Sequence, residues 1–101
     1  MAARIELSVR FRRDLVELSD WIAQDSPARA ITFIDDILAD CREVLGPFPY
    51  SGRSRPEYGR NMRSIVSHER TVIYSYDAKR SVLRLHRLMG AQRVSRRDFE
   101  G

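Results

Sequence analysis

The feature that most constrains the fold is a change in the spacing of apolar residues along the chain. Between residues 9 and 45, apolar side chains recur every three or four positions, which places them on one face of an α-helix. From residue 62 to 89 they are concentrated in three short runs rich in Val, Ile, Leu and Tyr, which is typical of β-strands. A segment rich in proline and glycine, residues 46–59, separates the two parts. The sequence therefore predicts helices followed by a sheet, an α+β fold.

Two helices are expected in the first part of the chain. Ser8 is a suitable N-cap for a helix that starts at Val9. Ser26 and Pro27 begin the second helix, because serine caps a helix and proline is tolerated in the first turn. Gly46 and Pro47 end it. The apolar stripes are Phe11, Leu15, Leu18 and Ile22 on the first helix, and Ala30, Phe33, Ile34, Ile37, Cys41 and Leu45 on the second; Arg12, Arg13, Asp14, Glu17 and Asp20 are expected on the other side of the first helix.

The helices are predicted to form an antiparallel hairpin against a small sheet. A short strand at residues 4–7 precedes them, and residues 62–66, 71–76 and 82–89 form a three-stranded antiparallel meander with tight turns at 67–69 and 77–80. The helices would pack on one face of the sheet, leaving the other face free for a partner. At 101 residues, we expect a single domain over 1–101, with residues 91–101 as a short helix or a mobile tail.

The charge balance favours an anionic partner. The chain has a net charge of +4, from 17 arginines and the single lysine Lys79 against 14 acidic residues. Guanidinium groups make bidentate contacts with carboxylates and phosphates, although a GC-rich genome would also produce this arginine bias. Cys41 has no second cysteine for a disulfide or a metal site. No leader and no apolar run approaching 18 residues is present, so we expect a cytoplasmic protein without a membrane anchor.

Few types of catalysis fit the sequence, and neither a metal nor a cofactor is expected. Metal-free cleavage of RNA needs a base, an acid and cations beside the phosphate. The candidates are His68 or Glu69 as base, His86 as acid, and Arg70 and Arg93 as cations. Each also has a structural interpretation, because residues 68 and 69 fall in a predicted hairpin turn and His86 lies on a strand face.

Several other side chains have two interpretations. Arg63 and Arg70 each open a predicted strand, so we expect them to lie close together and to share an anion, supplied by Glu57 or Glu69 or by a partner. Trp21 lies beside the apolar stripe of the first helix, where it packs at the edge of the core or enters a partner's groove. Tyr74 and Tyr76 share a strand face with Val72, and we expect packing there rather than base stacking.

An ordered run of motifs extends from residue 52 to residue 74: Gly52-Arg53, Arg55-Pro56-Glu57, Gly59, Arg63, Arg70, Val72-Ile73 and Tyr74. Further short motifs are Asp14-Leu15, Trp21-Ile22 and Phe33 on the helices, and Gly90-Ala91 followed by Arg93. With these motifs, of which the ordered run is the most specific, nearly the whole chain resembles the ParE branch of the RelE/ParE toxin superfamily. The resemblance implies a type II toxin, neutralised by a ParD-like antitoxin whose acidic C-terminal part binds as a helix in a groove and as an extended segment along the sheet. A toxin–antitoxin hetero-oligomer is expected.

For the ParE branch, the resemblance further implies inhibition of DNA gyrase by binding, without catalysis. The first alternative is a ribosome-dependent mRNA endonuclease of the RelE type, and the second is a protein of this fold that has lost toxicity and serves only in a complex. Those ribonucleases usually carry clustered lysines and arginines and a C-terminal tyrosine or histidine, whereas here Lys79 is the only lysine and Phe99 stands in the tail. Met89 replaces a histidine that many ParE-like chains have before the glycine. The candidate partner-binding residues are Trp21, Arg53, Arg55, Arg63, Arg70, Arg84, His86, Arg87 and Arg93.

Overall fold

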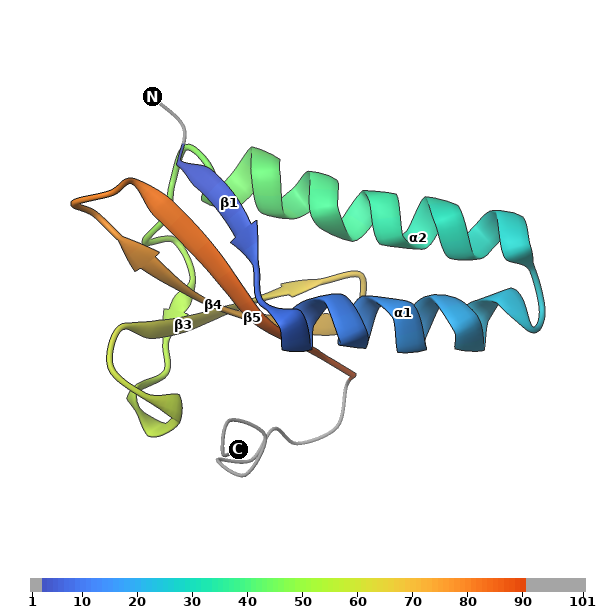
Figure 1. Ribbon diagram of the computed structural model, residues 1–101. Coiled ribbons are helices and arrows are strands. Elements are labelled where there is room, and N and C mark those ends of the chain that lie inside the picture. Colours follow the sequence, from blue (N-terminus) through green and yellow to red (C-terminus); the bar gives the residue numbers. More distant parts are fainter. Residues whose placement is uncertain (1–2, 91–101) are drawn as a thin grey trace.

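The computed structural model describes residues 3–90, which form two helices and a five-stranded sheet (Figure 1). The elements in chain order are β1 (Arg4–Leu7), α1 (Val9–Ala23), α2 (Pro27–Asp40), a π-helical turn (Cys41–Leu45), β2 (Arg53–Ser54), a 3-10 turn (Pro56–Tyr58), β3 (Met62–Ser67), β4 (Arg70–Asp77) and β5 (Val82–Met89). The predicted tail at 91–101 lies outside the described residues. No helix within residues 3–90 is long and apolar enough to cross a membrane.

The sheet confirms the predicted meander and adds a strand. Its strand order is β1-β5-β4-β3-β2, with β3, β4 and β5 antiparallel to one another. β1 pairs with β5 in parallel, aligning Arg4 with Val82 and Leu7 with Leu85. The two-residue strand β2 was not predicted, because it lies inside the proline- and glycine-rich segment and pairs only with β3. The α+β fold class is confirmed.

Both helices begin where the sequence predicts. The Ser8 hydroxyl accepts a hydrogen bond from the Phe11 amide at 2.9 Å, and the Ser26 hydroxyl accepts one from Arg29 at 3.2 Å. Each cap satisfies an amide that has no partner within its own helix. Figure 1 shows α1 and α2 running side by side in opposite directions and extending together beyond the sheet.

The core lies between the helices and one face of the sheet. Its fully buried members come from both helices, the π-helical turn, β4 and β5: Phe11, Ile37, Cys41, Leu45, Val72, Tyr74, Leu83 and Leu85. The predicted stripes of both helices contribute to it. Burial raises the pKa of the Cys41 thiol to about 12, so the thiol stays protonated and packs as a small apolar group. A smaller cluster of Met62, Ile73 and Met89, covered by Tyr58, forms separately.

Asp14 was expected on the outer side of the first helix, but in the structure it is buried. Its carboxylate accepts hydrogen bonds from Arg87 Nε at 2.8 Å, from Arg87 Nη2 at 3.2 Å and from the Leu88 amide at 2.9 Å. β1 ends opposite Leu85, so the edge of β5 beyond that point has no neighbouring strand among residues 3–90. The Asp14 carboxylate and the Ser8 hydroxyl instead bind the backbone groups of this edge: Asp14 accepts from the Leu88 amide, and Ser8 donates to the His86 carbonyl at 2.9 Å.

The expectation that Arg63 and Arg70 share an anion was wrong. In the β3–β4 pair, Arg63 lies opposite Tyr74 and Arg70 lies opposite Ser67. The first residues of two antiparallel strands lie at opposite ends of the hairpin, so the two arginines are separated by most of its length. At about 3.4 Å per residue, four residue steps along a strand amount to roughly 14 Å.

Candidate functional site

The loop segment of residues 46–60, in which the family motifs begin, is fixed to the sheet by Tyr74. The Tyr74 hydroxyl donates to the Pro49 carbonyl at 2.8 Å and accepts from the Gly52 amide at 2.9 Å. A side chain on Gly52 would overlap the Tyr74 hydroxyl and approach the Ser64 carbonyl to 2.9 Å, so only glycine fits at this position. Burial raises the pKa of Tyr74, which keeps the phenol protonated as a donor. The expectation that Tyr74 packs is confirmed.

Arg63 holds the same segment from a second side. Its Nη1 donates to the Gly52 carbonyl at 2.9 Å and to the Tyr50 carbonyl at 3.2 Å, and its guanidinium lies 5.2 Å from the centre of the Tyr50 ring. The Tyr50 ring in turn meets the Tyr76 ring edge to face at 5.2 Å. Arg63 therefore binds backbone carbonyls and an aromatic ring, and contacts no carboxylate within residues 3–90.

The other arginines of this segment differ in exposure. Arg53 is exposed on the edge strand β2, and Arg60 is exposed in the turn before β3. Arg55 is half-buried: Nη2 donates to the Tyr58 hydroxyl at 3.2 Å, and Nε lies 3.8 Å from a Glu57 oxygen. The structure thus presents Arg53 and Arg60 to solvent, whereas Arg55 and Arg63 help to shape the loop.

A hollow of about 800 Å³ opens between this segment and the turn that joins β4 to β5. Tyr50 and Tyr76 contribute aromatic rings to its lining, and Arg60, Arg63 and Lys79 contribute positive charge. Figure 1 shows the loop before β3 and the β4–β5 turn at the end of the sheet away from the tip of the helical hairpin. The hollow is therefore a cationic and partly aromatic surface.

A second region surrounds Trp21, which is 64% exposed. Of the two interpretations of Trp21 that the sequence left open, this exposure contradicts packing at the core edge. Trp21 and Arg70 together line two adjoining hollows of about 230 and 330 Å³. The Arg70 guanidinium lies 5.9 Å from the centre of the Phe33 ring, and its buried Nε has no hydrogen-bond partner among the described residues. Arg70 is half-buried and lines both hollows, so it places a positive charge beside them.

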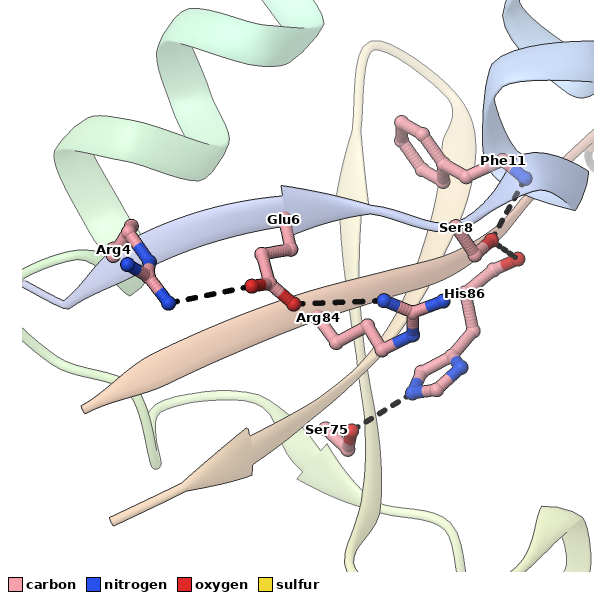
Figure 2. A network of polar contacts seen from close by, with 7 residues as sticks. All are labelled: Arg4, Glu6, Ser8, Phe11, Ser75, Arg84 and His86. Carbon is pink, nitrogen blue, oxygen red and sulfur yellow. Dashed lines mark hydrogen bonds and ion pairs between the residues drawn. The ribbon is translucent and has the colours of Figure 1, made fainter. Parts of the chain in front are cut away.

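Charged side chains also line the sheet face opposite the helices, as Figure 2 shows. Glu6 bridges Arg4 at 3.4 Å and Arg84 at 3.5 Å. His86 Nε2 lies 2.7 Å from the Ser75 hydroxyl. Burial, together with the charge of Arg84, lowers the pKa of His86, which keeps the ring neutral at neutral pH.

The candidate acid–base groups do not form one cluster within residues 3–90. His68 and Glu69 form the β3–β4 turn with φ values of 50° and 65°, which confirms the turn interpretation. His68 contacts α2, with Nε2 3.4 Å from an Asp40 oxygen and its ring edge to face with Phe33. His86 instead contacts Ser75 on β4. No three His, Cys, Asp or Glu side chains among these residues are placed to hold a metal ion.

Two of the sequence candidates, Arg87 and Arg93, are still to be placed, and one lining residue of the larger hollow was not among the candidates. Arg87 is 7% exposed and paired with Asp14, so it stabilises the joint between α1 and β5. Arg93 lies outside the described residues. Tyr50, which forms an exposed ring beside the cations of the larger hollow, was not among the sequence candidates. Its position between Pro49 and Gly52 gave no periodic signal that could have indicated it.

The comparisons with known proteins agree with this arrangement. No curated protein sequence matches the chain. The fold is shared with the chromosomal ParDE toxin–antitoxin system of P. aeruginosa, at 14% identity and a TM-score of 0.72, over 90% of this chain and 98% of that chain. It is also similar to a RelBE toxin–antitoxin complex from Mycobacterium tuberculosis, at 14% identity and a TM-score of 0.64, over 89% of this chain and 99% of that chain.

These likenesses show that the chain has the fold found in toxin–antitoxin systems of this kind. The sequence decides the family: residues 5–94 match the family described as "ParE toxin of type II toxin-antitoxin system, parDE". The chain belongs to the ParE toxin family.

Proposed function

We propose that this toxin inhibits DNA gyrase by binding to it, and that a ParD-like antitoxin with an acidic C-terminal segment neutralises it. The match to the ParE family over residues 5–94 is the observation that carries this proposal. The positions of the titratable groups also support it. His68 and His86 are each engaged in separate local contacts, so they are poorly placed to act as the base and acid of one reaction. The toxin would act in the cytoplasm, where gyrase and chromosomal DNA are found.

Purified gyrase provides the test of the target. We expect the toxin to block supercoiling of relaxed plasmid in vitro and to induce a DNA-damage response when expressed. Replacing His68, Glu69 and His86 together should leave both effects in place, because none of the three acts in chemistry under this proposal. If translation stops first and message is cut on ribosomes, the protein is a RelE-type endonuclease instead.

We further propose that the region around Trp21 and Arg70 receives the antitoxin. An exposed tryptophan beside hollows is a typical hot spot for binding, and Arg70, which lines the same hollows, offers a positively charged donor group for a carboxylate. The antitoxin's acidic segment would supply that carboxylate. Attraction between a basic toxin and an acidic segment should also speed association at low salt.

Calorimetry with the antitoxin encoded in the neighbouring reading frame tests this contact. Trp21→Ala should weaken binding by at least about 30-fold, the effect of losing a hot-spot residue. Arg70→Gln should also weaken binding, and its effect should fall at high salt. Val9→Ala is the matched control, since Val9 is exposed on the same helix but lines none of these hollows. Equal affinities for Trp21→Ala and Val9→Ala would refute the proposed contact.

A further inference from the structure

The hollow of about 800 Å³ at the loop end of the sheet is not needed for the antitoxin contact proposed above. It lies beside the last residues of β4, whereas Arg70 is the first residue of that strand. Seven residue steps of about 3.4 Å place the two ends of β4 roughly 24 Å apart. We propose that this hollow binds single-stranded nucleic acid, taking an unpaired base against Tyr50 and the flanking phosphates on Arg60 and Lys79. The proposal does not depend on gyrase being the target.

The aromatic part of the hollow is exposed and held in place. Tyr50 is 58% exposed, yet its carbonyl accepts a hydrogen bond from Arg63 and its ring contacts both the Arg63 guanidinium and the Tyr76 ring. A ring fixed in this way loses little conformational freedom when a base stacks on it. Base–aromatic stacking is the usual means by which proteins bind single strands without sequence preference.

Two of the cations that line the hollow have no ion-pair partner among the described residues. Arg60 comes from the turn before β3 and Lys79 from the β4–β5 turn, and neither has an ion-pair partner among residues 3–90. Asp77 is the one carboxylate among the lining residues, and it already accepts a hydrogen bond from the Arg80 amide at 3.2 Å. Cations from two separate turns on either side of a ring suit a chain of phosphates with a base between them.

The shape and chemistry favour a nucleic acid over an acidic peptide. Carboxylates would use the cations alone and leave the Tyr50 and Tyr76 rings without a function, whereas a nucleotide uses both. The volume lies within the range of pockets that take ligands the size of a nucleotide. A single strand is required, because a base in a duplex is already stacked between its neighbours and cannot reach a ring inside a hollow.

Fluorescence anisotropy with the purified toxin and a labelled oligothymidine of about 12 nucleotides, a usual footprint for such binders, provides the test. We expect the single strand to bind more tightly than the matched duplex. Tyr50→Ala should raise Kd about tenfold, as expected for loss of one stacked base, and Tyr50→Phe should restore the affinity. Lys79→Gln should reduce the slope of log K against log salt by about 0.7, one phosphate contact on a single strand.

Arg13→Gln is the matched control, because it removes one exposed positive charge on α1 and leaves the hollow intact. The hollow is not a nucleic-acid site if Arg13→Gln and Lys79→Gln weaken binding of the single strand equally. It is also not one if duplex and single strand bind with the same affinity and Tyr50→Ala changes neither affinity. The proposal is also wrong if a polyglutamate peptide binds and loses as much affinity on Tyr50→Ala as the oligonucleotide does. Circular dichroism verifies that each variant is folded, and gyrase inhibition is measured separately.

Discussion

Replacing Asp14 by alanine should strongly destabilise the protein, although the residue lies on a helix that is largely exposed. The Asp14 carboxylate is 7% exposed and holds Arg87 Nε at 2.8 Å, Arg87 Nη2 at 3.2 Å and the Leu88 amide at 2.9 Å. Alanine would leave the Arg87 guanidinium, itself 8% exposed, without this carboxylate. It would also leave the Leu88 amide without its acceptor at the edge of β5.

The expected loss is large compared with the total stability. Removing one partner of a buried ion pair costs about 3–5 kcal/mol, and domains of this size are stable by only about 5–15 kcal/mol. At about 4 °C per kcal/mol, the lower limit for a domain near 100 residues, the melting temperature should fall by at least roughly 12 °C.

Thermal and urea unfolding followed by circular dichroism measure this loss. Asp20→Ala is the matched control, because Asp20 is exposed on the same helix and its loss should cost less than about 0.5 kcal/mol. Asp14→Asn keeps an oxygen for the Leu88 amide but removes the charge, so its melting temperature should lie between those of Asp14→Ala and Asp20→Ala. If Asp14→Ala and Asp20→Ala unfold at the same temperature, the buried pair does not hold α1 to β5 and our reasoning fails.

Three further predictions concern the loop, the acid response and the thiol. Gly52→Ala should lower the free energy of unfolding, measured with urea, by about 1–3 kcal/mol, because the new methyl group overlaps the Tyr74 hydroxyl. Ser51→Ala, at the exposed neighbouring position, should leave the free energy of unfolding almost unchanged. Because folding lowers the pKa of His86, the unfolded chain binds more protons, so stability should decrease as pH falls through 6.5 and His86→Gln should flatten this dependence. Iodoacetamide should label Cys41 at pH 8 only after unfolding, since burial raises its pKa to about 12; rapid labelling of the native protein would contradict this.

The structure also changes how the arginines between residues 53 and 63 are understood. They lie close together in the sequence, but in the structure they divide into two sets by what they contact. Arg63 donates to the Tyr50 and Gly52 carbonyls and so fixes the loop, whereas Arg60 is exposed at the rim of the hollow. We therefore expect substitutions of Arg63 to affect stability first, and substitutions of Arg60 to affect binding without unfolding the protein.

The sequence by itself determined the elements of the fold. The caps at Ser8 and Ser26, the helical stripes and the runs of strand-forming residues depend on interactions between residues close in the chain, and the structure has the helices and the meander where these signals predicted them. The turn at His68 and Glu69 was predicted for the same reason.

Only the tertiary structure decided which polar side chains are buried and which are brought together. Asp14 is polar like its exposed helical neighbours, and it is buried because β1 ends opposite Leu85 and leaves an edge of β5 beside α1. Arg63 and Arg70 are separated because antiparallel strands start at opposite ends of a hairpin. Such outcomes depend on pairing between residues distant in sequence, for which spacing along the chain carries no information.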